Sequence, residues 1–228
     1  MGTRTALITG ASRGLGYELA RALSASGWSL VVDGRDAAAL EAAVGSWAGG
    51  DIAPLPGDVA DPAHQQSLFA EVAKRGRLDL LVNNASSLGP TPLPSLADYP
   101  LGQLQAVLEV NVIAPLGLIQ LALPWLRKSG GRIINITSDA AVEGYPGWGG
   151  YGSSKAALEQ ASRVLAAEEA DVRVYWVDPG DMNTRMQQDA YPGEDVSDRP
   201  PASDSVPGLL SLIEGALPSG RYSARALP

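Results

Sequence analysis

The sequence predicts one α/β domain, residues 1–228, built on a doubly wound parallel β-sheet with helices on both faces. Two observations predict this class. Short, nearly continuous apolar runs recur along the chain, as in parallel strands that are covered on both faces. Segments with helical periodicity separate these runs, and this alternation is typical of a parallel sheet. A chain of 228 residues also fits a single domain that needs no metal or disulfide for stability.

Six apolar runs are the expected strands, and they alternate with five expected helices. The strands are Ala6–Thr9, Leu30–Val32, Ile52–Leu55, Leu78–Val82, Ile133–Thr137 and Val172–Val177. The helices cover about residues 14–26, 37–47, 62–74, 101–127 and 151–169. Asp36 and Asp61 are expected to cap the second and third helices, and Pro62 suits a first helical turn. Gly220–Ala224 is long enough only for a short last strand.

The composition excludes several kinds of site. The chain has no cysteine, so it has no thiol nucleophile and no disulfide. Its one histidine, His64, lies in an expected first helical turn, where we expect a solvated surface side chain. The formal net charge of −8 argues against nucleic-acid and anionic membrane partners. No apolar run approaches about 18 residues and no signal-peptide pattern opens the chain, so we expect a cytoplasmic protein without a membrane span.

A glycine-rich turn, Gly10–Gly16, follows the first expected strand and leads into the first helix. Gly10 permits a tight turn, Gly14 lets the backbone approach a pyrophosphate, and Gly16 permits close packing of helix and sheet. The N-terminus of the helix offers free N–H groups to an anion. The spacing G-x-x-x-G-x-G differs from the more usual G-x-G-x-x-G, but its place at the first strand-to-helix turn predicts dinucleotide binding.

A second group of residues predicts proton transfer to a carbonyl oxygen. Tyr151 and Lys155 are four residues apart and share a face of their helix. A lysine ammonium beside a phenol is expected to lower the tyrosine pKa, which makes Tyr151 a usable general acid. Ser138 follows a strand, and its hydroxyl can bond the same carbonyl; Thr137 competes for this role, but its side chain faces the opposite way. The hydride must come from a cofactor, because no protein side chain supplies one.

These motifs together resemble the short-chain dehydrogenase/reductase family over residues 5 to about 185. Further matches in the family's order are Asn83-Asn84-Ala85 after a strand, Asn111 in the long central helix, and Pro179-Gly180 with Thr184. Ser86 stands where the family usually has glycine. The resemblance implies a Rossmann-like fold and an oxidoreductase whose catalytic residues are Asn111, Ser138, Tyr151 and Lys155. In that pattern Asn111 holds a water that links Lys155 to bulk solvent.

The resemblance also implies the cofactor site, in which Asp58 accepts a hydrogen bond from the adenine amine and Lys155 binds ribose. The implied cofactor-binding residues are Gly10, Ser12, Arg13, Gly14, Leu15, Gly16, Arg35, Asp58, Val59, Asn83, Ala85, Tyr151, Lys155, Pro179, Gly180, Met182 and Thr184.

The end of the second strand indicates which nicotinamide cofactor binds. NAD recognition uses an acidic residue there, and NADP recognition uses arginine beside the 2′-phosphate. In the family's pattern the acidic position falls on Gly34, and Arg35 follows it. Arg13 lies where NADP-using relatives often carry a second basic residue, and two guanidinium groups can clamp one phosphate. We therefore expect NADP(H), although a shift by one residue would place Asp33 at the acidic position and favour NAD.

The segment Gly180–Val206 is polar and rich in Asp, Pro and Ser. A long segment of this composition is either a functional lid or disordered, and its place after the Pro179-Gly180 turn favours a lid. Trp148, shortly before Tyr151, either walls the substrate pocket or packs elsewhere. Met182 and Met186 are adaptable side chains that either line the pocket or fill the core.

The sequence predicts a small carbonyl or alcohol as substrate and a homo-oligomer as the working form. A dimer through the central helices is favoured, because the short last strand weakens the tetramer interface that the family often builds there. Substrate identity lies in Ser87–Tyr99, Gly144–Gly150 and Gly180–Val206. The rival interpretation is a catalytically silent NADP(H)-binding regulator of the same fold, and the four filled active-site positions favour the enzyme.

Overall fold

The computed structural model describes residues 2–228, which form a seven-stranded sheet in the order β3-β2-β1-β4-β5-β6-β7. All neighbouring strands are parallel, which confirms the predicted fold class. The strands are β1 (Thr5–Ile8), β2 (Ser29–Gly34), β3 (Ile52–Pro56), β4 (Leu80–Asn83), β5 (Arg132–Ile136), β6 (Arg173–Asp178) and β7 (Gly220–Ser223).

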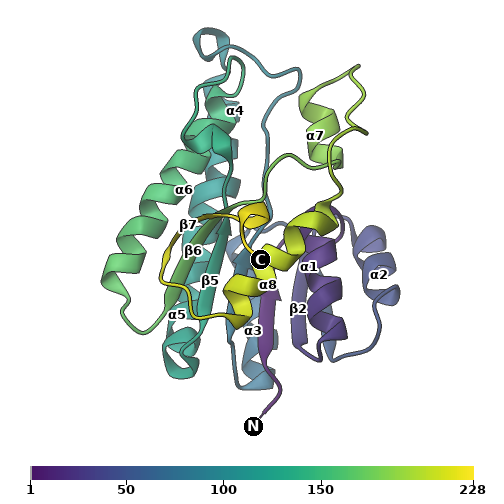
Figure 1. Cartoon of the computed structure of the whole chain (residues 1–228), viewed down its shortest axis with the longest axis vertical. Helices are drawn as coiled ribbons and strands as arrows, with labels where there is room; N and C mark the ends of the chain where they lie inside the picture. The colour runs from purple at the N-terminus through teal and green to yellow at the C-terminus, as the bar shows by residue number, and fades with distance from the viewer. Residues whose placement is uncertain (1) are drawn as a thin grey trace.

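Helices cover both faces of this sheet (Figure 1). One hydrophobic cluster joins one face of the strands to α1, α2 and α8, and a second joins the other face to α3, α5 and α6. The helices are α1 (Gly14–Ala25), α2 (Ala37–Gly45), α3 (Pro62–Arg75), α4 (Leu101–Leu108), α5 (Ala114–Ser129), α6 (Gly149–Glu168), α7 (Arg185–Ala190) and α8 (Val206–Glu214).

The strand order reverses between β1 and β4, because the chain returns to the middle of the sheet after β3. Ligands of such sheets bind outside the carboxyl ends of the strands, at the point of reversal. The glycine turn Gly10–Gly16 follows β1, and Asn84 follows β4. The fold therefore brings the two sequence motifs together at the same edge of the sheet.

The predicted caps are confirmed at both helices. Asp36 accepts a hydrogen bond from the Ala39 amide at 3.1 Å, and Asp61 accepts one from the Ala63 amide at 2.9 Å. Pro62 occupies the first turn of α3. A short polar side chain before a helix satisfies an amide that has no partner inside the helix, so these caps define where α2 and α3 begin.

The sequence predicts one continuous helix over residues 101–127, but the structure shows an interrupted one. A π-helical segment, Glu109–Ile113, separates α4 from α5. Asn111 lies in this segment and is buried. A π-helical turn widens the helix by one residue and is often found at functional sites. Hydrophobic periodicity does not reveal it, because the apolar pattern continues on both sides.

The expectation of a solvated His64 is wrong. Its side chain is 8% exposed, and Nε2 lies 3.3 Å from Asp33 Oδ2. Gly57 allows this approach, because a Cβ at Gly57 would lie 2.2 Å from His64 Nδ1. His64 is thus packed between the ends of β2 and β3, and tertiary contact rather than helical position decides its burial.

The segment Gly180–Val206 contains structure that its polar composition did not indicate. It includes α7 and a short 3-10 helix, Ala202–Ser205. Val196 and Ala202 are buried, and Met182 packs against the core cluster of α1 and α8. In Figure 1, α7 lies at the end of the molecule opposite the N-terminus.

The helical stretch Leu101–Ser129 is long and apolar enough to cross a membrane by length and composition. Its most apolar window is 39% buried in this structure. The buried positions of α5, among them Leu118, Ala122 and Leu126, pack in the sheet's second cluster. A helix that packs one face against a sheet can have the same apolar composition, so length and composition alone do not indicate a membrane span here.

Candidate active site

A cleft of about 1040 Å³ lies at the carboxyl ends of the strands. The glycine turn lines it at Gly10 and Gly14, and the candidate catalytic residues line it at Ser138, Tyr151 and Lys155. The structure therefore unites the two groups of residues that the sequence indicated separately. The other expected cofactor residues that line the cleft are Ser12, Arg13, Leu15, Arg35, Asp58, Val59, Ala85, Pro179, Gly180, Met182 and Thr184.

The glycine turn has the backbone geometry expected of it. Gly10 and Gly14 have φ of +67° and +59°, a region that favours glycine. A Cβ at Gly16 would lie 2.5 Å from both the Asn84 Nδ2 and the Gly10 carbonyl oxygen. Gly16 thus serves packing, and it lies behind the residues that line the cleft.

Asn84 holds the glycine turn against β4. Its Nδ2 donates to the Thr9 carbonyl at 2.9 Å and to the Gly10 carbonyl at 3.2 Å. In residues 2–228 the N-terminus of α1 has no side-chain cap, so its first amides remain free to face an anion. This geometry fits the pyrophosphate of a dinucleotide. Asn83, the neighbour that the sequence indicated, instead lies in the core, where its Nδ2 donates to Asn135 Oδ1 at 2.8 Å.

Both carboxylate oxygens of Asp33 are occupied by the protein. Oδ1 accepts a hydrogen bond from the Gly10 amide at 2.7 Å, and Oδ2 lies 3.3 Å from His64 Nε2. Asp33 is 1% exposed. Arg35 and Arg13 line the cleft beside it and are exposed; Arg13 Nη2 lies 3.8 Å from Asp36 Oδ2.

Tyr151 and Lys155 are both buried at the base of the cleft, with exposed fractions of 8% and 1%. Lys155 Nζ donates to the Ile136 carbonyl at 2.7 Å and lies 5.5 Å from the centre of the Tyr151 ring. Trp148 packs edge-on against Tyr151, with ring centres 5.6 Å apart, and lines the cleft. Trp148 therefore forms a wall of the cleft. Trp148 and Met186 both pack against a small hydrophobic cluster that includes Tyr151.

Burial changes the acidity of both groups. It raises the pKa of Tyr151, and Asp178 and Asp139 raise it further, while the hydroxyls of Ser86 and Ser138 lower it. Burial lowers the pKa of Lys155 to about 7. The expected lowering of the Tyr151 pKa is wrong for this structure, because burial disfavours the charged form of Tyr151 and of Lys155 alike.

Ser138 lies at the end of β5 with its side chain in the cleft. Its Oγ donates to Asp139 Oδ1 at 2.8 Å and accepts from the Ala140 amide at 3.1 Å. Thr137 is 1% exposed, and its Oγ1 donates to Glu159 Oε1 at 2.9 Å. Thr137 is committed to this contact, so of these two hydroxyls it is Ser138 that lies beside Tyr151. The Ser86 hydroxyl also lies near Tyr151 and donates to Asn111 Oδ1.

Asn111 supports the site from behind the cleft. Its Nδ2 donates to the Ser87 carbonyl at 2.8 Å and to Ser154 Oγ at 2.9 Å. Its Oδ1 accepts from the Ser87 amide at 2.8 Å and from Ser86 Oγ at 3.2 Å. All the hydrogen-bonding capacity of the amide is used in joining the loop after β4 to α6. The water relay through Asn111 stays a prediction.

Several cleft residues were not singled out by the sequence. Asp139 lies next to Ser138, and its Oδ2 accepts from Tyr145 OH at 3.0 Å. Asp178 ends β6, and its Oδ1 accepts from the Gly180 amide at 2.9 Å. Burial raises the pKa of Asp178. The sequence offered one signal for each of these two carboxylates. Asp139 directly follows Thr137-Ser138, and Asp178 directly precedes Pro179-Gly180, so both adjoin residues already expected in the site.

Comparison with known proteins bears on this site. A family model described as short chain dehydrogenase matches residues 4–195. A benzil reductase ((S)-benzoin forming) of Saccharomyces cerevisiae is 33% identical over 192 residues, covering 80% of this chain and 73% of that protein. An L-fucose dehydrogenase of Mus musculus is 35% identical over 228 residues, covering 98% of this chain and 78% of that protein. A short chain dehydrogenase of Shigella flexneri 2A str. 301, solved in complex with NADP, has a TM-score of 0.87 at 27% identity and covers 99% of this chain and 98% of that chain.

The matched stretch includes the glycine turn, the strand end at Ser138 and the helix that carries Tyr151 and Lys155. The likeness therefore extends over the candidate site as well as the sheet. On these grounds the chain belongs to the short-chain dehydrogenase/reductase family of oxidoreductases.

Proposed function

We propose that this chain transfers a hydride between NADP(H) and a small carbonyl or alcohol substrate, as a ketone or aldehyde reductase or in the reverse direction. The observation that carries the proposal is the meeting of Ser138, Tyr151 and Lys155 in the cleft that the glycine turn also lines. A dinucleotide held at the glycine turn and extended toward Tyr151 has both ends accommodated by one cleft.

The roles follow from the chemistry of the side chains. Tyr151 donates its proton to the carbonyl oxygen as hydride adds to the carbon, so the product is the alcohol. The raised pKa of Tyr151 keeps the phenol protonated at neutral pH, which suits an acid in the reductive direction. Ser138 hydrogen-bonds the same oxygen. When bound, the nicotinamide supplies the hydride.

Lys155 and Asn111 support Tyr151 in this proposal. With its pKa lowered to about 7, Lys155 can gain and lose a proton near neutral pH and so help to return a proton to Tyr151. Ser154 Oγ donates to the Tyr151 carbonyl at 2.6 Å and accepts from Asn111. Asn111 thereby holds the first turn of α6 in place beneath the reacting phenol.

A preference for NADP(H) is supported by the contacts of Asp33. A carboxylate that already serves the Gly10 amide and His64 is poorly placed to bind ribose hydroxyls. Arg13 and Arg35 are exposed on the same part of the cleft and can clamp a 2′-phosphate. The Shigella flexneri relative is described as complexed with NADP, which agrees with this preference.

The test is a panel of ketones and aldehydes assayed by loss of NADPH absorbance. Wild-type protein should turn over at least one member, and Tyr151→Phe should be slower by about 10²–10⁴-fold, because it retains the ring but has no transferable proton. NADPH affinity should remain nearly unchanged in the variant. Comparable turnover by Tyr151→Phe would exclude Tyr151 as the acid. Absence of turnover across the panel, with tight NADPH binding, would favour the silent regulator.

We also propose that the chain forms a homodimer through α5 and α6. An apolar groove runs between these helices, lined by Leu116, Ile119, Leu123, Val164 and Leu165 together with polar neighbours. Val164 is 45% exposed, which is high for a large apolar side chain on a folded surface. Exposed apolar surface of this kind often marks a protein interface.

A further inference from the structure

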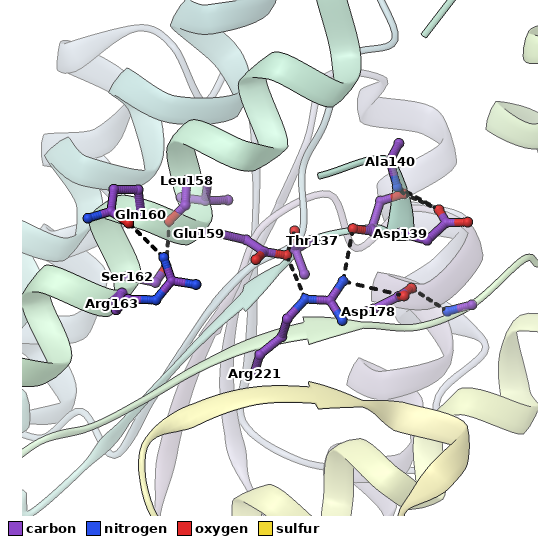
Figure 2. Close-up of polar contacts among 12 residues, drawn as sticks. Thr137, Asp139, Ala140, Leu158, Glu159, Gln160, Ser162, Arg163, Asp178 and Arg221 are labelled. Atoms are coloured by element: carbon purple, nitrogen blue, oxygen red, sulfur yellow. Dashed lines mark hydrogen bonds and ion pairs between the residues drawn. The ribbon is translucent and has the colours of Figure 1, made fainter. Parts of the chain in front are cut away.

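Arg221 on β7 contacts three elements that border the candidate active site (Figure 2). Its Nε donates to Glu159 Oε1 at 2.9 Å, and its Nη2 donates to the Ser138 carbonyl at 3.2 Å. Nη2 also lies 3.7 Å from Asp178 Oδ2. Glu159 lies on α6 one turn beyond Lys155, Ser138 follows β5, and Asp178 ends β6. One guanidinium therefore joins the last strand to the three elements that carry the site.

Arg221 is the positive charge that balances the carboxylates of Glu159 and Asp178. The side chains of Glu159 and Asp178 are 4% and 16% exposed. Within residues 2–228, Arg221 is the one cation in an ion pair with either carboxylate. Burial raises the pKa of Asp178, and Arg221 acts in the opposite direction. Removing Arg221 would leave the buried carboxylate of Glu159 and the half-buried carboxylate of Asp178 without a compensating charge, which is destabilising.

The contact with Ser138 is made through the backbone. The Ser138 carbonyl accepts hydrogen bonds from the Ala141 amide at 3.1 Å and from Arg221. The Ser138 side chain meanwhile extends into the cleft. Arg221 therefore restrains the residue whose hydroxyl must align with a carbonyl, from a position outside the cleft lining. Asp178 transmits a second restraint, because its other oxygen accepts the Gly180 amide.

We propose that Arg221 is a positioning residue for the reaction: it holds Ser138 and the Pro179-Gly180 turn in register, and it balances the buried carboxylate of Glu159 and the half-buried carboxylate of Asp178. The kinetic consequence rests on the proposed function. The groups that face Tyr151 are Lys155 on its own helix, Asp139 and Ser138 after β5, Asp178 on β6, and Ser86 after β4.

Arg221→Met is the first test, with Arg163→Met as the matched control. Arg163 is an exposed arginine on α6, one turn beyond Glu159, and its guanidinium packs over Trp176. Arg221→Met should lower kcat by about 10²-fold, the scale that a small misplacement of a reacting group produces. NADPH affinity should fall by much less than kcat, because the glycine turn lies in the other half of the sheet and only the Pro179-Gly180 end of the expected cofactor site depends on Arg221. Arg163→Met should retain wild-type kcat.

The titration of Asp178 gives a readout that a general loss of stability would not move. Arg221 lies 3.7 Å from Asp178 and lowers the pKa of its carboxyl group, so this pKa should rise in Arg221→Met and keep its wild-type value in Arg163→Met. Carbon-13 NMR of the Asp178 carboxyl carbon measures the shift. An unmoved Asp178 titration with wild-type kcat would overturn the proposal.

A second variant separates positioning from charge compensation. Arg221→Met/Glu159→Gln removes both charges and keeps an acceptor for Thr137, so it should fold. Its kcat should stay low, because the Ser138 carbonyl still lacks its donor and Asp178 still lacks its cationic partner. Full recovery of kcat would mean that Arg221 only compensates Glu159, and the proposal would fail.

Amide hydrogen exchange tests the positioning role of Arg221 without an activity assay. The Ala140 and Ala141 amides bond Ser138 Oγ and the Ser138 carbonyl in the wild type. They should exchange faster in Arg221→Met and at the wild-type rate in Arg163→Met. Unchanged exchange in Arg221→Met refutes the positioning role. A wild type that reduces no carbonyl refutes the proposed function instead, so the two failures are distinguishable.

Discussion

The carboxylate of Asp33 supports the glycine turn from within: its Oδ1 accepts the Gly10 amide at 2.7 Å while its Oδ2 faces His64 Nε2 at 3.3 Å. The end of β2 thereby contacts both the glycine turn that follows β1 and the first turn of α3. Since the acidic side chain serves this contact, the proposed preference for NADP(H) rests on the exposed arginines Arg13 and Arg35 that line the cleft nearby.

Arg35→Ala is expected to weaken NADPH binding by about ten- to a hundredfold and NADH binding little, because one charge-assisted hydrogen bond is worth roughly 1.5–3 kcal/mol. Fluorescence titration of both cofactors measures this. Arg21→Ala, which removes an exposed arginine of α1 outside the cleft lining, is the control. Equal losses for both cofactors would show that Arg35 does not contact the phosphate. A native preference for NADH would make Asp33 the ribose ligand.

The stability of the protein should depend on pH through Lys155. Burial lowers its pKa from 10.5 to about 7. Between these values the unfolded chain holds a proton that the folded chain has released, so the free energy of unfolding rises with pH across this window. Lys155→Met should flatten that rise, whereas the exposed-site control Lys128→Met should not. Denaturant unfolding at a series of pH values measures both slopes. Equal slopes in wild type and Lys155→Met would contradict the lowered pKa.

Asp139 should influence which substrates are accepted. Its carboxylate lines the cleft next to Ser138, so a substrate with its own negative charge is repelled. Asp139→Asn should improve kcat/KM for an anionic carbonyl relative to a neutral analogue by at least about fivefold, which corresponds to about 1 kcal/mol between unit charges at 4 Å in water. Glu143→Gln changes an exposed acid on the same loop and should leave the ratio unchanged. An unaltered ratio in Asp139→Asn would show that Asp139 does not face the substrate.

The segment Gly180–Val206 should become more protected when ligands bind. It contacts the core through few large apolar side chains, so opening it costs little free energy. Closure over the cleft would exclude water from the reacting groups. Hydrogen exchange of α7 and its flanks, with and without NADP and substrate, measures the change. Strong protection in the free protein would identify a fixed wall.

Val164→Asp should shift the protein from dimer to monomer. It introduces a charge into the apolar groove between α5 and α6, where burial in an interface would be costly. Light scattering after size-exclusion chromatography gives the mass of each species. Val142→Asp alters an exposed apolar residue outside that groove and should remain dimeric. A monomeric wild type would refute the proposed interface.

Features that depend on neighbours in the sequence are predictable from the sequence alone. The alternation of apolar runs with helical segments predicts the parallel sheet, and Asp36 and Asp61 are recognisable as caps because a cap acts within three residues. Tyr151 and Lys155 share a helix face by spacing alone. The glycine turn is likewise local, since its strand and helix are consecutive.

Features that depend on strand order were decided by the tertiary structure. Asp33 and His64 meet because β2 packs beside the start of α3, and this contact buries a histidine that its helix position would expose. Asn83 faces Asn135 rather than the cleft because β4 pairs with β5. Arg221 reaches Ser138 across 83 residues of sequence. Such contacts carry no local pattern, because the pairing of distant strands brings the residues together only after the chain has folded.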